Sequence, residues 1–143
     1  MNSKILNQKT IKKITTFDGI GLHSGKNLMV KILPSAPNTG ITFIRSDLKK
    51  NNIIKPNVFN VSEASFCTTI SNEFGARVST IEHLMAALYV KGVDNAVIEV
   101  NGPEIPIMDG SSQEFLDLIN NAELEISDQP IKLIKIDKDV NFS

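Results

Sequence analysis

The chain has 143 residues, of which 15 are lysine or arginine and 16 are aspartate or glutamate, so its formal net charge at pH 7 is −1. This balance gives the whole chain no electrostatic attraction for nucleic acid, and we expect no nucleic-acid partner. Apolar residues make up 41% and charged residues 22%, as in a globular protein, and no apolar run is long enough to be a transmembrane segment.

Cysteine content and the first residues bear on the cellular compartment. The single cysteine, Cys67, excludes an internal disulfide. The stretch 1–10, MNSKILNQKT, contains lysines but no apolar segment of the kind found in export signals. Both features lead us to expect a cytoplasmic protein.

The first half of the chain is dominated by predicted strands. β-Branched residues mixed with lysines over 9–17 predict a half-exposed strand, and the glycine-rich stretch 18–26 predicts a loop. Alternation with a period of two predicts a second strand over 27–34. Further strands are predicted over 41–47 and 65–72.

Two helices are predicted in the second half. The first begins at Ser79 or Thr80, has an apolar stripe at spacings of three and four residues, and ends at Gly92. A strand over 95–102 and a helix over 112–121 follow. Strands first and helices later predict an α+β, two-layer domain, with two helices packed on one face of a mostly antiparallel sheet.

The last part of the chain does not fit a domain that ends with the second helix. Residues 131–143 alternate like a strand, but a polar link over 125–130 separates them from that helix. A strand needs partners, and the sequence contains none after it. We therefore expect these residues to belong to another sheet.

Glu82 and His83 combine the chemistry of a helix start with that of a metal site. Ser79-Thr80-Ile81-Glu82 fits a capping box, and on pattern alone this interpretation outweighs a catalytic Glu82, although the two roles can coexist. His83 lies away from the apolar stripe of its helix, so it is either a hydrogen-bonded core histidine or a metal ligand. In the second case, the neighbouring carboxylate could take a proton from an activated water.

The other candidates are weak when each is taken alone. Catalytic zinc normally takes three protein ligands, and the second histidine, His23, reads as an exposed loop residue. Asp109 is a turn or helix-start residue before it is a ligand. Cys67 is interpreted as a small buried residue of a strand, because no neighbouring base activates it. The stretch 19–26 lacks the spacing of a phosphate-binding loop.

Taken together and in order, several stretches resemble one family. They are GIGLHSGK, APNTGITFIRSDL, STIEHLMAAL and VDNAVIEVNGPEIPIMDGSS. Over residues 8–126 the chain resembles the N-terminal half of the zinc-dependent UDP-3-O-acyl-N-acetylglucosamine deacetylases of lipid A synthesis in Gram-negative bacteria. This resemblance implies two similar α+β domains with the active site between them. It divides the chain into an N-terminal deacetylase domain, 1–126, and a linker with the first strand of a second domain, 127–143.

The resemblance also implies a role for each matching residue. Glu82 would be the general base that activates the zinc-bound water, and His83 would be the one zinc ligand from this domain. His23 would lie near the mouth of the active site, and the strand that lines the substrate region would contain Phe66, Cys67 and Thr68. The other zinc ligands, a His-x-x-x-Asp pair, and a second catalytic histidine would come from the second domain.

The expected function follows from these roles. The substrate would be a UDP-linked acylated glucosamine, whose acetamide is hydrolysed to acetate and a free amine. We expect the 143-residue chain to be an incomplete deacetylase, which a separately encoded second domain could complete. The alternative is a non-catalytic binding or regulatory module that docks a partner through the face around His83, Ala87 and Val90.

Overall fold

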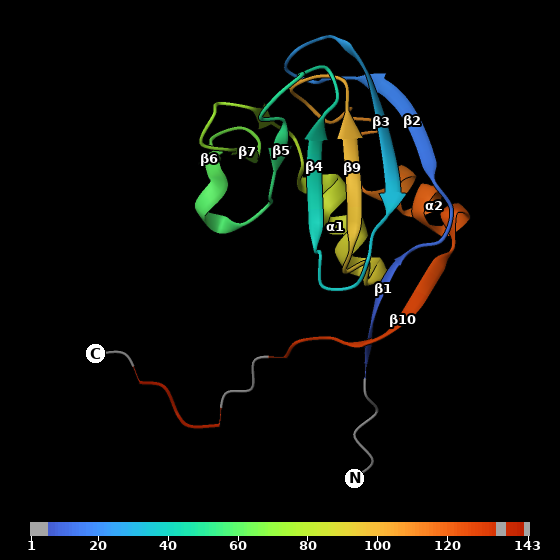
Figure 1. Ribbon diagram of the computed structural model, residues 1–143. Helices are drawn as coiled ribbons and strands as arrows, with labels where there is room; N and C mark the ends of the chain where they lie inside the picture. The colour runs from blue at the N-terminus through green and yellow to red at the C-terminus, as the bar shows by residue number, and fades with distance from the viewer. Residues whose placement is uncertain (1–5, 134–136, 142–143) are drawn as a thin grey trace.

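The computed structural model describes residues 6–133 and 137–141, and its centre is a five-stranded sheet (Figure 1). The order across the sheet is β2 (Thr15–Ile20), β3 (Asn27–Pro34), β9 (Ala96–Val100), β4 (Ile41–Arg45) and β5 (Ile53–Ile54). Neighbouring strands are antiparallel except for β4 and β9, which are parallel. The mostly antiparallel sheet is therefore confirmed.

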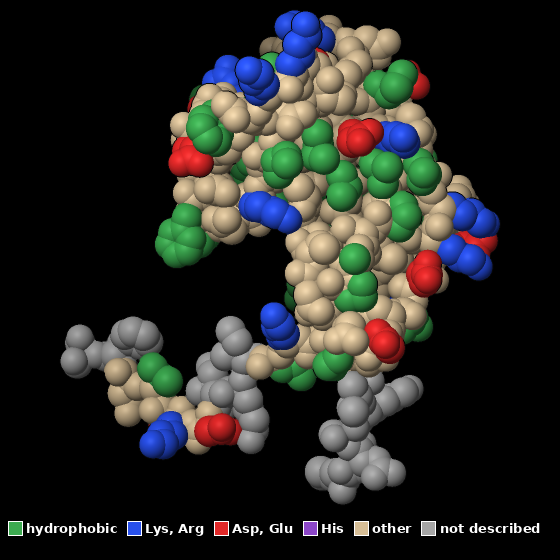
Figure 2. Space-filling view, viewed as in Figure 1, with side chains coloured by type: hydrophobic (Ala, Val, Ile, Leu, Met, Phe, Trp, Pro, Cys, Tyr) green, Lys and Arg blue, Asp and Glu red, His purple; other side chains and the backbone are tan. Residues whose placement is uncertain are grey.

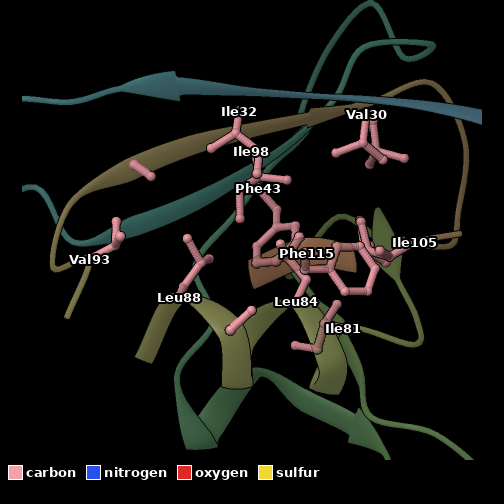
Figure 3. Packing of buried hydrophobic residues seen from close by; sticks show 14 of the residues in the cluster. Val30, Ile32, Phe43, Ile81, Leu84, Leu88, Val93, Ile98, Ile105 and Phe115 are labelled. Carbon is pink, nitrogen blue, oxygen red and sulfur yellow. The ribbon is translucent and has the colours of Figure 1, made fainter. Parts of the chain in front are cut away.

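Two helices, α1 (Glu82–Lys91) and α2 (Gln113–Ala122), cover one face of this sheet (Figure 1). In Figure 3, Phe43 and Ile98 of the sheet point toward Leu84 and Leu88 of α1 and Phe115 of α2. The predicted α+β, two-layer arrangement with both helices on one face is confirmed. Neither helix of the described residues has the length and apolarity to cross a membrane.

The elements that were predicted well follow simple periodicity. In β3, Leu28, Val30 and Ile32 are buried, as alternation with a period of two requires. Helix α1 ends at Gly92, whose φ of 68° lies in the left-handed region that glycine adopts at low cost.

The prediction of one strand over 9–17 is wrong. The stretch forms two strands, β1 (Asn7–Ile11) and β2, which lie in different sheets. The break falls at Lys12 and Lys13, whose backbone N–H groups donate to the carbonyls of Glu123 and Ala122 at the end of α2. Strand β2 also continues to Ile20, into the predicted loop.

The polar link predicted over 125–130 is a strand. Strand β10 (Leu124–Pro130) pairs antiparallel with β1 in a two-stranded sheet of its own. Its side chains are mostly polar and exposed, so the local sequence does not indicate a strand. Its partner, β1, lies at the other end of the chain. The domain boundary after residue 126 stays a prediction, although β10 extends across it.

The strand predicted over 131–143 is absent from the part of this stretch that the structure describes. Residues 131–133 and 137–141 have no helical or strand assignment. Residues 134–136 and 142–143 lie outside the described residues.

A third, smaller sheet stands beside the large one (Figure 1). It contains β6 (Val61–Glu63), β7 (Thr69–Ser71) and β8 (Arg77–Val78), and a short 3-10 helix, η1 (Val58–Asn60), precedes it. Figure 2 shows apolar side chains at the surface on this side of the molecule. The strand predicted over 65–72 is shorter than expected and comprises only β7. Directly before β7, the Thr68 N–H donates to the Glu82 side chain of α1 and not to a neighbouring strand.

Candidate active site

The predicted capping box at the start of α1 is wrong. Helix α1 begins at Glu82, and no side chain caps it. The Ser79 hydroxyl instead donates to the carbonyl of Pro103, with 3.0 Å between Ser79 Oγ and the oxygen. Thr80 has a φ of 57°, in the left-handed region that a β-branched residue rarely adopts, so the first turn does not extend back to Ser79.

This arrangement leaves the Glu82 carboxylate available for another role. Its Oε2 accepts a hydrogen bond from the backbone N–H of Thr68, with 3.0 Å between N and Oε2. Within the described residues, no hydrogen bond engages the other oxygen, Oε1. The amides at the helix N-terminus favour a negative charge at this position. Glu82 is thus a carboxylate with one oxygen held and one oxygen free.

His83 is half-buried, and it lies where α1 meets α2. Its backbone carbonyl accepts a hydrogen bond of 3.0 Å from Ser112 Oγ, just before α2. Its Nδ1 is buried and has no hydrogen-bond partner among the described residues. A buried polar atom without a partner costs about 1–3 kcal/mol. The interpretation of His83 as a hydrogen-bonded core histidine therefore finds no partner here to support it.

A cavity of about 350 Å³ brings together residues that lie far apart in the sequence. Its walls include His23, Phe66 and Cys67, three of the residues that the sequence had selected. Glu82 and His83 do not line this cavity. Glu82 is connected to it through Thr68, which follows Cys67 and donates to the Glu82 carboxylate.

The interpretation of Cys67 as a small buried residue within a strand is wrong. Cys67 is half-buried and precedes β7, and its Sγ lies 3.7 Å from Thr69 Oγ1. Phe66 beside it is 88% exposed. Neither residue lies within a strand, because residues 65–68 have no strand assignment.

One residue of the cavity wall, Glu104, was missed in the sequence. It is only 1% exposed, and it accepts hydrogen bonds from the backbone N–H groups of His23 and Ser24, each with 2.9 Å between N and O. Thr80 Oγ1 donates to it at 3.1 Å. Burial raises the pKa of Glu104, but the bonds from His23, Ser24 and Thr80 together hold that pKa below its ordinary value.

The amides of His23 and Ser24 form the kind of concave site in which loops bind anions. Here the chain's own carboxylate occupies it. This agrees with the conclusion that 19–26 is not a phosphate-binding loop. A single acidic residue inside the apolar run PEIPIM was the available signal for Glu104.

The described residues fit one position of a metal site. Among them, no three His, Cys, Asp or Glu side chains come together to hold an ion. His83 offers one imidazole, while catalytic zinc normally takes three protein ligands. Asp109 is exposed, and its carboxylate accepts hydrogen bonds of 2.9 Å from the backbone N–H and the hydroxyl of Ser111, which lower its pKa.

Comparison with known proteins shows which family and which relatives this chain is similar to. The family described as LpxC, UDP-3-O-acyl N-acetylglycosamine deacetylase, matches residues 8–143. Relatives named UDP-3-O-acyl-N-acetylglucosamine deacetylase include those of Shewanella sp. strain W3-18-1, at 45% identity, and of Shewanella oneidensis strain MR-1 and Shewanella sp. strain ANA-3, both at 44%.

Each of these three alignments covers 133 residues, which is 93% of this chain and 44% of the relative. The chain thus spans less than half of the length of the curated relatives it matches. The family match begins within strand β1 and extends to residue 143, and it includes every later element of the fold described above. The chain belongs to the UDP-3-O-acyl-N-acetylglucosamine deacetylase family.

Proposed function

We propose that this chain supplies half of the active site of a zinc-dependent deacetylase, which hydrolyses the N-acetyl group of UDP-3-O-acyl-N-acetylglucosamine. Family membership supports the reaction and the substrate. The observation that carries the proposal is the state of Glu82, which is not a helix cap but a carboxylate with Oε2 fixed by the Thr68 amide. The lipid A pathway and a cytoplasmic location belong to the same proposal.

In the reaction, a water adds to the acetamide carbonyl, the C–N bond breaks, and acetate and a free amine are released. Glu82 accepts the proton of the attacking water through its free Oε1, while the Thr68 amide keeps the carboxylate oriented. A positioned base of this kind accelerates such a reaction by roughly 10²- to 10⁴-fold.

His83 would hold the zinc ion from this side. Its Nδ1, buried and without a partner in the described part of the chain, supports an imidazole placed for something other than core packing. Zinc, when bound, polarises the carbonyl group and lowers the pKa of a water molecule. On the side of the chain, the Ser112 hydroxyl bonds to the His83 carbonyl and so holds the backbone that carries the imidazole.

The rest of the site would come from a second domain. We propose that a His-x-x-x-Asp pair completes the zinc ligands and that a further histidine protonates the leaving amine. This domain would either continue the same polypeptide or be separately encoded. The alignment covers 44% of the relative's length, which leaves room in such a relative for a second domain of this kind.

The test is to mix the 143-residue chain with a second half, made from the remaining residues of a close relative, and to measure acetate release. We expect no turnover from the chain alone and recovered turnover in the mixture. Glu82→Gln should lower the recovered kcat by roughly 10²-fold or more. The matched control is Glu114→Gln, which changes the equivalent acidic residue in the first turn of α2.

Two outcomes would contradict the proposal. Robust acetate release by the chain alone would show that the site is not split. A mixture in which Glu82→Gln keeps full activity would remove Glu82 from the role of general base.

A chelator should abolish activity, and His83→Ala should raise the zinc concentration that restores it.

A second candidate, a non-catalytic binding module, has one observation in its favour. On α1, Tyr89 is 86% and Val90 is 70% exposed, although both are apolar. Ala87, which was expected on the same docking face, is fully buried. If the second half protects the amides of Tyr89 and Val90 from hydrogen exchange, this face belongs to the deacetylase. If only another protein protects them, the binding module is favoured.

A further inference from the structure

Glu104 joins two segments that lie far from each other in the sequence. Its Oε1 accepts from the His23 N–H at 2.9 Å and from the Thr80 hydroxyl at 3.1 Å, and its Oε2 accepts from the Ser24 N–H at 2.9 Å. The carboxylate is 1% exposed, so these bonds are made out of water, where charge-assisted hydrogen bonds are strong. One oxygen is thus shared between the His23 loop and the segment before α1.

The His23 loop, residues 21–26, is built to approach this carboxylate closely. The N–H of Gly21 donates to the carbonyl of Lys26, and the N–H of Gly25 donates to the carbonyl of Gly21, so the loop closes on itself. A Cβ placed on Gly21 would lie 2.4 Å from Glu104 Oε2 and 2.4 Å from Ser24 Oγ. Only glycine therefore lets the loop close around Glu104.

The other side of the junction is the start of α1. Thr80 is buried with a φ of 57°, a conformation that costs of order 1–3 kcal/mol and persists only when its surroundings hold it. The bond from its hydroxyl to Glu104 and the pairing of Ser79 with Pro103 and Ile105 supply that support. Glu82 and His83 follow directly, so their placement depends on this segment.

We propose that Glu104 is a positioning residue, which fixes the His23 loop relative to the start of α1, the segment that leads directly into Glu82 and His83. A role of His23 in a reaction rests on the proposed deacetylase function. The anchoring itself does not, because the bonds to Glu104 exist without substrate, metal or second domain.

The anchoring is measured by amide hydrogen exchange in the 143-residue chain, comparing the native chain with Glu104→Gln. The glutamine keeps the shape but turns one acceptor into an NH₂ donor that faces a backbone N–H. We expect the amide of His23 or of Ser24, or both, to exchange roughly 10- to 100-fold faster. The amides of Leu84 and Ile98 in the core should change by less than about threefold, because the opening is local.

Gly21→Ala is a second variant that leaves Glu104 in place, and it should speed exchange at the same amides by pushing the loop away. Glu73→Gln is the control, because it removes a charge from an exposed turn and should leave all these amides unchanged. Unchanged protection of His23 and Ser24 in both Glu104→Gln and Gly21→Ala would overturn the proposal. Equal acceleration at every amide would also overturn it, since it would indicate a general stabilising role.

The catalytic consequence is measured in the mixture of the two halves. Glu104→Gln should lower kcat by about tenfold or more while KM stays within about threefold, because a displaced group affects the reacting centre more than substrate binding. An unchanged kcat would overturn the positioning role. A native mixture without activity would count against the proposed deacetylase, and the exchange experiment would still decide whether Glu104 anchors the loop.

Discussion

Two regions of the molecule differ in how far buried apolar side chains and hydrogen bonds hold them in place. The body, which we define as the five-stranded sheet with α1 and α2, encloses the buried apolar side chains shown in Figure 3, such as Phe43 and Phe115. The site side, which we define as η1, the loop 21–26, the sheet β6–β7–β8 and the segment 103–105, adds side chains such as Ile105 to this core, buries Glu104 and leaves Phe59 93% exposed. Apolar burial supplies most of the stability, whereas directional hydrogen bonds fix positions.

The largest expected effect is therefore the loss of an aromatic side chain from the body. Phe115 of α2 is buried and packs edge-to-face against Phe17 of β2, with 5.5 Å between ring centroids. Phe115→Ala should lower the free energy of unfolding by about 3–5 kcal/mol, because it leaves a cavity between helix and sheet. Urea denaturation measures this loss. A value under about 1 kcal/mol would mean that α2 is not an integral part of the body.

A smaller loss is expected where the body meets the site side. Arg45, at the end of β4, is buried, and it donates from Nη1 to the carbonyl of Arg77 in β8 at 2.8 Å. Its Nε and Nη2 donate to Asp47 at 2.8 and 2.7 Å. Arg45→Met keeps the apolar stem and removes these bonds, which should cost roughly 1.5–3 kcal/mol.

The matched control for this prediction is Arg77→Met. The Arg77 side chain is exposed, and only its backbone carbonyl takes part in the contact. The substitution should change the free energy of unfolding by less than about 0.5 kcal/mol. Equal losses in the two variants would contradict the junction between β4 and β8.

The same division explains what could be predicted from the sequence. In the body, the alternation of β3 and the stop of α1 at Gly92 depend on neighbours along the chain, and both were predicted. Strands β1 and β10 were misread because each needs a partner at the opposite end of the chain. Periodicity describes which face of an element is apolar, but it does not describe which segment pairs with it.

On the site side the partners also lie outside the local sequence pattern. The capping box failed because Glu82 bonds to Thr68, 14 residues away, and Glu104 was missed because it bonds to His23, 81 residues away. The family resemblance selected His23, Phe66 and Cys67, which do line one cavity. Their roles, and those of Glu82 and His83, stay predictions, since lining a cavity is not the same as acting in it.

The free energy of unfolding should depend on pH through Glu104 of the site side. The pKa of Glu104 is lowered in the folded chain, so the unfolded chain takes up this proton at higher pH. The stability from ionised Glu104 is therefore fully present above the pKa of the unfolded chain, about 4.3, and is lost as the pH falls through the lower folded value. Protonation keeps one acceptor oxygen in place, so the loss should be smaller than for Arg45→Met.

This dependence is measured by urea denaturation between neutral and acid pH. Asp47 has a lowered pKa as well, chiefly because Arg45 donates to it, and it acts in the same direction. Glu104→Gln isolates one contribution, since its stability should fall less steeply below pH 4.3 or so than that of the native chain. Parallel curves for the two proteins would mean that Glu104 is not ionised against the His23 loop.

The smallest effect is expected at the aromatic residues of the site side. Phe59 of η1 is as large as Phe115 but lies almost wholly in water. Phe59→Ala should thus change the free energy of unfolding by no more than about 0.5 kcal/mol, against the several kcal/mol expected for Phe115→Ala. If urea denaturation gives similar losses for the two, Phe59 is packed in solution and the site side has an apolar core of its own. If the losses differ as expected, folding does not account for an exposed phenylalanine at position 59, and its role then depends on what the site side binds.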